Sequence, residues 1–180
     1  MQRLLMMFAL WSLPFMSVLA TEFQLPNWTV QTASGDNREL HDWITAQPHT
    51  LVAVVASTSQ ENGQAQQQAM MNMHQQLLET TPALPAVLHL NIIAGAPRFV
   101  HGFIRRGIVG EYQAPVQDDQ VLLMFPRNYD EFTAATAVGV DNYGTWFLVT
   151  DDGRILWSVK QNEALDAEVL TGQLTALLDR

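Results

Sequence analysis

The stretch Gly144-Thr145-Trp146-Phe147-Leu148-Val149-Thr150-Asp151-Asp152-Gly153-Arg154-Ile155 carries the strongest structural signal in the chain. Two runs rich in β-branched, aromatic and aliphatic residues, 145–150 and 154–159, flank the turn residues Asp-Asp-Gly. Such runs around an Asp-Gly step are typical of a β-hairpin. The sequence therefore predicts an antiparallel hairpin here. Asp151 and Asp152 are interpreted as turn residues and not as a catalytic carboxylate pair.

Upstream of this hairpin, strand and helix patterns alternate. The apolar run 51–55 has the length of a strand and suits a central position covered on both faces. A polar loop over 57–63, a helix over about 64–78 and a strand over 86–93 follow it, which predicts a right-handed βαβ unit. A last helix follows the hairpin, and Asn162 is expected to cap it. The predicted fold class is α/β, with a mixed sheet, helices on both faces and a C-terminal β-hairpin plus helix.

Two of the predicted helices carry apolar residues at helical spacing. In the helix over 64–78 the glutamines are expected on the solvent side, opposite a buried stripe. The stripe consists of Ala65, Ala69, Met70, Met73 and Leu77. A second helix is predicted over 98–108 from the spacing of Phe99, Val100, Phe103, Ile104 and Ile108.

This order of elements resembles the thioredoxin-like fold, specifically exported thiol–disulfide proteins and the related peroxiredoxins. Residues 25–30, Leu-Pro-Asn-Trp-Thr-Val, look like the family's opening strand, and residues 51–57 look like its central strand. The region 137–155 is similar to the family's "YGV … GTPTTFLID.DGRI" segment. The hairpin over 145–157 also has a looser likeness to cysteine-free periplasmic proteins of the YtfJ type. The resemblance implies a thioredoxin-like domain over 21–180.

The departures from this family concern its redox site. The chain has 180 residues and no cysteine. The family's two redox cysteines would fall at Ser59 and Asn62, and its cis-proline would fall near Gly144, where 141–144 contains no proline. A serine hydroxyl cannot form a disulfide and needs a neighbouring base to act as a nucleophile. Thiol exchange and thiol peroxidase activity are therefore excluded, and we assign no catalytic residue and expect no cofactor.

The same loop is nevertheless the predicted binding site. In α/β folds, ligands gather beyond the central strand and at the N-terminus of the following helix. The residues expected to face one another there are Ser59, Gln60, Glu61, Asn62, Tyr143 and Gly144. Two interpretations stay open. The loop either keeps a groove for an exported protein or peptide partner, or serves only as a helix cap.

Residues 1–20 have the organisation of a signal peptide. Arg3 precedes an apolar run over 4–13, and small or apolar residues lead up to Ala20. The run is shorter than the roughly 20 residues that a membrane span needs. A buried N-terminal helix is the alternative, but the segment has no amphipathic period. The sequence predicts cleavage after Ala20, a periplasmic or secreted location, and no membrane insertion after cleavage.

The charge pattern of the chain bears on its partners. Eighteen acidic residues against nine Lys and Arg make a formal charge of −9, which argues against nucleic-acid binding. Arg98, Arg105 and Arg106, with Arg127, concentrate four of those nine cations and would suit an anion or an acidic peptide. The alternative is a solvated helix face paired with nearby carboxylates. The carboxylates considered are Asp118, Asp119 and Glu111.

A metal site has weaker support. Met71 and His74 are three residues apart, and thioether plus imidazole suits Cu(I). They supply only two ligands, and methionine is also common core filler. Metal or anion handling is thus the alternative to a partner-binding function.

Overall fold

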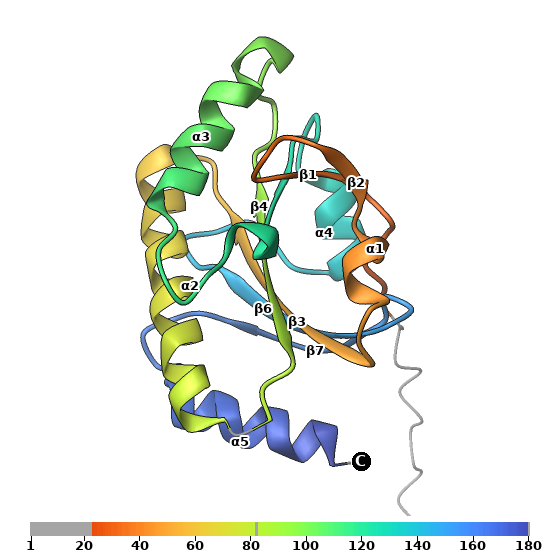
Figure 1. Ribbon diagram of the computed structural model, residues 1–180, viewed down its shortest axis with the longest axis vertical. Helices are drawn as coiled ribbons and strands as arrows, with labels where there is room; N and C mark the ends of the chain where they lie inside the picture. The colour runs from red at the N-terminus through yellow and green to blue at the C-terminus, as the bar shows by residue number, and fades with distance from the viewer. Residues whose placement is uncertain (1–22, 82, 180) are drawn as a thin grey trace, which may run out of the picture.

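The structure, a computed structural model, describes residues 23–81 and 83–179. This part of the chain forms five α-helices and a seven-stranded sheet of order β2-β1-β5-β4-β3-β6-β7 (Figure 1). The strands are β1 (Thr29–Thr32), β2 (Asn37–Glu39), β3 (His49–Ala56), β4 (Ala86–Ile92), β5 (Val121–Met124), β6 (Thr145–Thr150) and β7 (Ile155–Lys160). The α-helices are α1 (His41–Ile44), α2 (Gln60–Thr80), α3 (His101–Glu111), α4 (Asp130–Thr136) and α5 (Ala167–Leu178). Two 3₁₀ turns, η1 (Arg98–Val100) and η2 (Asp118–Gln120), precede α3 and β5.

The sheet is mixed, as predicted. The strands β3, β4 and β5 run parallel, and the remaining neighbours pair antiparallel. Strand β3 lies between β4 and β6, with Val52 opposite Leu88 on one side and Phe147 on the other. Because side chains alternate along a strand, Val52 and Val54 pack on one face while Leu51 and Ala53 pack on the other. The expectation of a central strand buried on both faces is confirmed.

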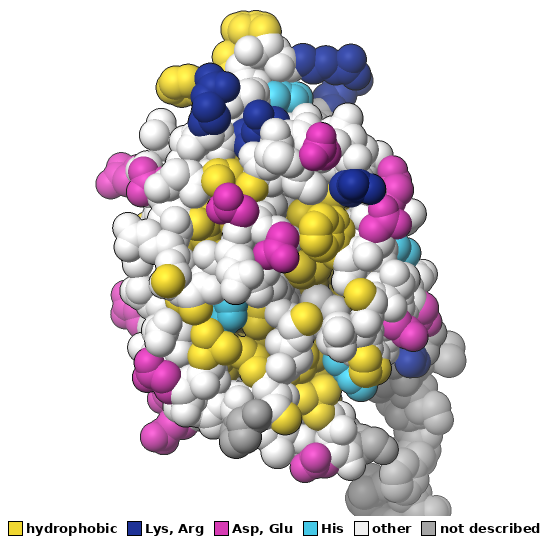
Figure 2. Space-filling model, viewed as in Figure 1, with side chains coloured by type: hydrophobic (Ala, Val, Ile, Leu, Met, Phe, Trp, Pro, Cys, Tyr) yellow, Lys and Arg dark blue, Asp and Glu magenta, His cyan; other side chains and the backbone are white. Residues whose placement is uncertain are grey.

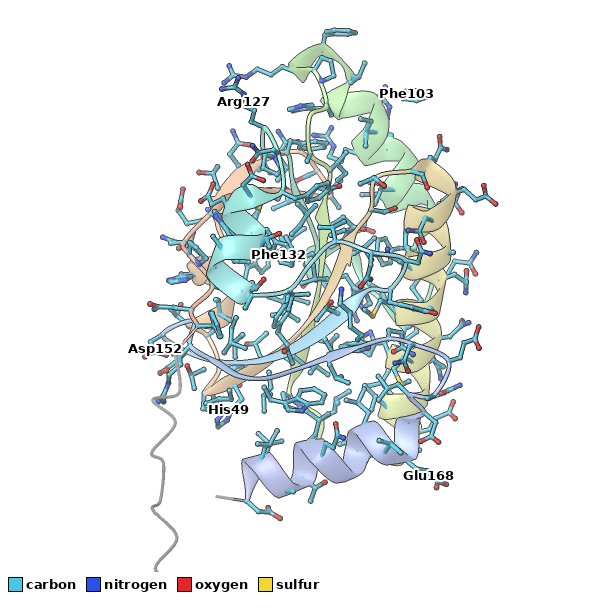
Figure 3. The ribbon with its side chains drawn as sticks, turned by 180° about the vertical axis from the view of Figure 1, so that it is seen from behind. His49, Phe103, Arg127, Phe132, Asp152 and Glu168 are labelled. Carbon is cyan, nitrogen blue, oxygen red and sulfur yellow. The ribbon has the colours of Figure 1, made fainter. Side chains whose placement is uncertain are left out.

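Helices cover both faces of the sheet. Helices α1 and α4 pack on one face, where Ile44 and Phe132 enter the core (Figure 3). Helices α2 and α5 cover the other face, where Met70, Trp146 and Leu170 pack together (Figure 1). The predicted α/β class with a C-terminal hairpin and helix is therefore confirmed.

The hairpin turn depends on Gly153. Its φ of 83° lies in the left-handed region, and a Cβ there would approach the Leu25 carbonyl oxygen to 3.0 Å. The turn also anchors the N-terminal part of the described chain, because Leu25 N donates to Gly153 O and Ile155 N donates to Phe23 O. Asp151 and Asp152 are exposed turn residues, as expected.

Three local predictions are wrong. Helix α2 begins at Gln60 and not near 64, because Ser59 caps it. Asp166 caps α5, whereas Asn162 accepts from Ala164 N in the preceding turn. Gln66 and Gln67 were expected in solvent but are buried, because the fold supplies partners for their amides.

The predicted signal peptide over 1–20 lies outside the described residues. Within 23–81 and 83–179, no helix has both the length and the apolar character needed to cross a membrane.

Candidate functional site

The link between β3 and α2 is held by its own serines. The Ser59 Oγ accepts from Asn62 N at 3.2 Å, and the Ser57 hydroxyl donates to Ser59 O at 2.9 Å. Within the described chain, no histidine or carboxylate hydrogen-bonds to Ser59 Oγ. The hydroxyl at the first redox position is therefore a helix cap, with no base beside it to make it a nucleophile.

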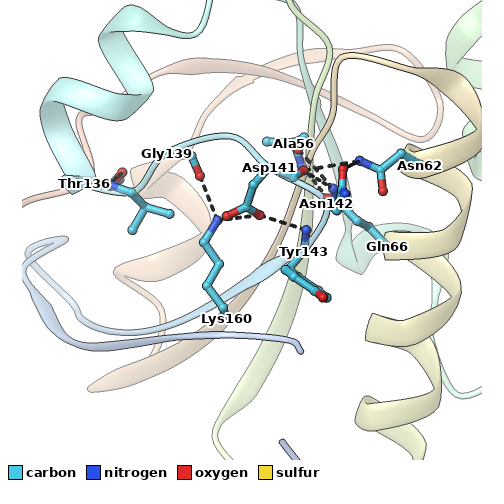
Figure 4. Close-up of polar contacts among 10 residues, drawn as sticks. Ala56, Asn62, Gln66, Thr136, Gly139, Asp141, Asn142, Tyr143 and Lys160 are labelled. Atoms are coloured by element: carbon cyan, nitrogen blue, oxygen red, sulfur yellow. Dashed lines mark hydrogen bonds and ion pairs between the residues drawn. The ribbon is translucent and has the colours of Figure 1, made fainter. Parts of the chain in front are cut away.

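The second redox position joins α2 to the 141–144 loop. Asn62 Nδ2 donates to Asp141 O and to Asn142 Oδ1, each at 3.3 Å (Figure 4). Gln66 Nε2 donates to the same Asp141 carbonyl at 2.9 Å, and Gln66 Oε1 accepts from Ala56 N at 3.1 Å. The structure brings Asn62 and the loop together, as expected. It joins them by direct hydrogen bonds instead of leaving an open groove between them.

Lys160, on β7, also holds the 141–144 loop in place. Lys160 Nζ forms an ion pair with Asp141 Oδ1 at 3.1 Å and donates to Gly139 O at 2.7 Å. Asp141 Oδ1 also accepts from Tyr143 N at 2.8 Å. Gly144 is buried, and a Cβ there would lie 2.3 Å from Met70 Cε and 3.0 Å from Val54 O. A side chain at this position, where the thioredoxin-like pattern has its cis-proline, would therefore require Met70 to move.

Two hollows flank the N-terminal half of α2. The first, here called the α3 cleft, has a volume of about 590 Å³ and lies between the 57–60 loop, the end of β4 and α3. The second, here called the α5-side groove, has about 510 Å³ and runs along α2 beside 142–144 and 161–166. Ser59 and Gln60 line the α3 cleft, and Tyr143 and Gly144 line the α5-side groove. Glu61 and Asn62 line neither. The six predicted residues thus do not form one surface.

The α3 cleft lies where parallel sheets usually bind ligands. Val55 and Ile92, at the carboxyl ends of β3 and β4, line it together with Phe103 and Ile104 from α3. Polar groups enter from the 57–60 loop, from Gln67 and from Asn91. The walls combine apolar side chains with a few polar groups, as small-ligand and peptide sites do.

Tyr129 and Gln67, two polar residues without a sequence motif, line the α3 cleft and hydrogen-bond to backbone carbonyls of neighbouring elements. The Tyr129 hydroxyl donates to Ser57 O at 2.6 Å and lies 3.3 Å from Ile92 O, so it connects the ends of β3 and β4. Gln67 Nε2 donates to Ile108 O at 3.0 Å and fixes α3 against α2. Their sequence context carries no signal for these roles, because both contacts join elements far apart in the chain.

Met71 and His74, the candidate metal ligands, are both buried and contact other side chains of the protein. His74 Nδ1 lies 3.1 Å from His89 Nε2, and both rings are buried. Burial lowers the pKa of His74 to about 4. Burial, with a smaller effect of the His74 charge, lowers the pKa of His89 to about 3. Met71 packs against Val121 in the core, and within the described residues no group of three or more His, Asp or Glu could hold a metal ion.

The arginines lie at one end of the molecule. Arg98, Arg106 and Arg127 are exposed, and the half-buried Arg105 has its guanidinium against the Gly35 backbone. In the described part of the chain none of the four forms an ion pair. The alternative of a solvated face agrees with the exposure of Arg98, Arg106 and Arg127, whereas its expected ion pairs with Glu111, Asp118 or Asp119 are not found in the described part of the chain.

Comparison with known proteins identifies the fold. No protein-family model and no curated protein sequence matches the chain. Solved structures do match, among them BsSco, a member of the Sco family of cytochrome c oxidase assembly proteins, at 12% identity and a TM-score of 0.62 over 87% of this chain and 94% of that one. Yeast Sco1 matches at 8% identity and a TM-score of 0.60 over 87% of this chain and 94% of its own. The thioredoxin domain of a Bacteroides vulgatus thiol-disulfide oxidoreductase matches at 12% and 0.51 over 88% and 97%.

The chain therefore has a thioredoxin-like fold, similar at low identity to Sco proteins and thiol-disulfide oxidoreductases. Because it contains no cysteine, it has no thiol-disulfide activity.

Proposed function

We propose that this protein is an exported binding protein that receives an extended segment of another protein in the α3 cleft. The observation that carries the proposal is the 590 Å³ cleft at the carboxyl ends of β3 and β4, beside a loop that contains no cysteine. Export is inferred from the pattern of residues 1–20.

The chemistry of the cleft favours an apolar side chain presented by a peptide. Val55, Ile92 and Ile104 offer aliphatic contacts, and Phe103 adds an aromatic edge. Gln60 and Gln64, exposed at the rim, can donate to or accept from a peptide backbone. A bound segment would thus gain apolar burial inside and polar contacts at the opening.

Copper handling has less support than peptide binding. His74 is hydrogen-bonded to His89, and Met71 is buried, so neither offers a free ligand at the surface. Binding a metal there would require opening the core between α2 and β4.

Two glycines of α3 provide a matched test. Gly107 lines the α3 cleft and Gly110 does not, and a Cβ at either position meets no atom within 4 Å. Gly107→Phe fills the cleft, whereas Gly110→Phe makes the same change in helix composition outside it. Peptides selected on the wild-type protein from a phage-displayed random library would be synthesised with a fluorescent label and titrated against each variant.

We expect Gly107→Phe to weaken binding at least tenfold and Gly110→Phe to leave it unchanged. Failure to enrich any peptide, or equal affinity of both variants, would contradict the proposal. Glu61→Lys with Tyr143→Ala then measures how far the site extends. Unchanged affinity confines it to the cleft, and a loss means that the segment continues over the N-terminus of α2.

A further inference from the structure

The end of the molecule formed by η1, the start of α3 and the loop after β5 is both aromatic and cationic. Phe99 is 88% exposed and Phe103 is 74% exposed, the two highest values among the large hydrophobic residues of the described chain. Figure 3 places Phe103 and Arg127 at this same end. We call the surface made by Arg98, Phe99, Phe103, Arg106 and Arg127 the α3 tip.

The charge of the tip is opposite to that of the whole protein. Residues 93–110 contain three arginines and no Asp or Glu, in a chain of formal charge −9. Figure 2 shows basic and hydrophobic side chains together at this end, with acidic side chains on the body below. Arg105 adds a half-buried guanidinium whose Nε has no hydrogen-bond partner. Arginine side chains bind phosphate and carboxylate groups through charge-assisted, often bidentate hydrogen bonds.

The shape of the tip limits what can cover it. Figure 1 shows the start of α3 protruding beyond the sheet, and both Phe99, in η1, and Phe103, in α3, are largely exposed there. A folded partner would need a matching concavity, whereas the interface of a bilayer deforms around inserted rings. Exposed aromatic residues flanked by arginines are the pattern of helices that lie at a membrane surface.

We propose that the α3 tip docks this protein on a bilayer that carries anionic headgroups. The two phenyl rings enter the boundary between headgroups and acyl chains, and the guanidinium groups bind lipid phosphates. The docking is peripheral and needs no membrane-spanning helix. The membrane proposal shares only Phe103 with the peptide-binding proposal. Because the vesicle assay contains no peptide, its result does not depend on whether a peptide binds in the α3 cleft.

Vesicle co-sedimentation tests the proposal. The purified protein would be incubated with vesicles of phosphatidylcholine alone and of phosphatidylcholine with a minority of phosphatidylglycerol. We expect binding to the anionic vesicles only, and its loss at high salt. Phe99→Ser with Phe103→Ser, and separately Arg98→Gln with Arg106→Gln, should each weaken binding about tenfold or more.

Two matched variants serve as controls. Arg98→Lys with Arg106→Lys keeps the charge and should keep most of the binding. Leu78→Ser with Val169→Ser removes two exposed apolar side chains on α2 and α5, and should change nothing. Absence of wild-type binding, or binding that survives both tip variants, would overturn the proposal. The proposal would also be overturned if the protein did not bind vesicles but bound polyglutamate, and if that binding depended on the same arginines. The partner would then be an acidic polypeptide.

Discussion

Acidification should destabilise this protein through the buried pair His74 and His89. Both imidazoles are neutral in the folded state, because burial lowers their pKa values from 6.5 to about 4 and about 3. In the unfolded chain both would titrate near 6.5. Between these values the unfolded state binds more protons than the folded state, so stability is complete above pH 6.5 and falls as the pH drops.

The size of the effect follows from this window. Each pH unit costs about 1.4 kcal/mol per histidine, so lowering the pH to about 5 removes about 2 kcal/mol for each and about 4 kcal/mol for the pair. Carboxylates remain largely ionised in this range and contribute little to the difference. A loss of that size is a large share of the stability of a typical domain, which is about 5–15 kcal/mol.

The assay is urea unfolding at about pH 7.5 and about pH 5, followed by tryptophan fluorescence. His74→Leu with His89→Phe removes both titrating groups and should reduce the difference between the two pH values to under about 1 kcal/mol. The control variant His49→Asn, at the accessible start of β3, should show the same difference in stability between the two pH values as the wild type. Equal wild-type stability at both pH values, or the same pH dependence in the double variant, would refute the assignment to this pair.

Three further predictions concern the start of α2 and the 141–144 loop. Gly144→Ala should lower the free energy of unfolding by about 1–3 kcal/mol, because its Cβ would overlap Met70 Cε and approach Val54 O. Met70→Ala removes a buried side chain and is itself destabilising, but in that background the additional loss from Gly144→Ala should be smaller. Thermal unfolding of the single and double variants measures this, and a neutral Gly144→Ala would contradict the packing argument. Ser59→Ala should lower the free energy of unfolding by about 1 kcal/mol, because it removes the oxygen that caps α2. Ser59→Asp should lower it much less, because the aspartate carboxylate can also cap the helix. Equal losses for both variants in urea unfolding would exclude the cap. Asn62→Ala should lower the free energy of unfolding by about 0.5–1.5 kcal/mol and speed amide hydrogen exchange in residues 141–144. Unchanged exchange would show that the hydrogen bonds of Asn62 do not stabilise this loop.

Local sequence patterns predicted which segments form strands and helices better than they predicted which side chains become buried. The hairpin over 145–155 could be predicted because turn chemistry and strand composition are encoded in adjacent residues. The helix expected over 98–108 exists, but helical spacing does not tell which residues another element covers. Phe99 and Phe103 remain exposed because α3 contacts the core through Ile108 and Val109, near its C-terminal end.

The candidate site was predictable only in outline. The fold pattern brings the start of α2 near 141–144, and that proximity holds. The sequence does not indicate that Asn62 and Gln66 hydrogen-bond to the 141–144 loop, or that Tyr129 and Gln67 bond to backbone carbonyls beside the α3 cleft. These contacts join residues 37 to 80 positions apart, beyond the reach of any local pattern.

The sequence alone determined that this protein has no thiol chemistry, because that chemistry requires a cysteine thiol and the chain contains no cysteine. It also determined the order of the strands and helices from β3 onward, since propensity, spacing and turn residues act between near neighbours, whereas the edge strand β2 was not predicted. The tertiary structure alone decided which polar groups were satisfied internally and which stayed open to solvent. It paired His74 with His89 and left Arg98 and Arg106 without carboxylate partners within the described chain, because burial and pairing depend on residues brought together only by folding.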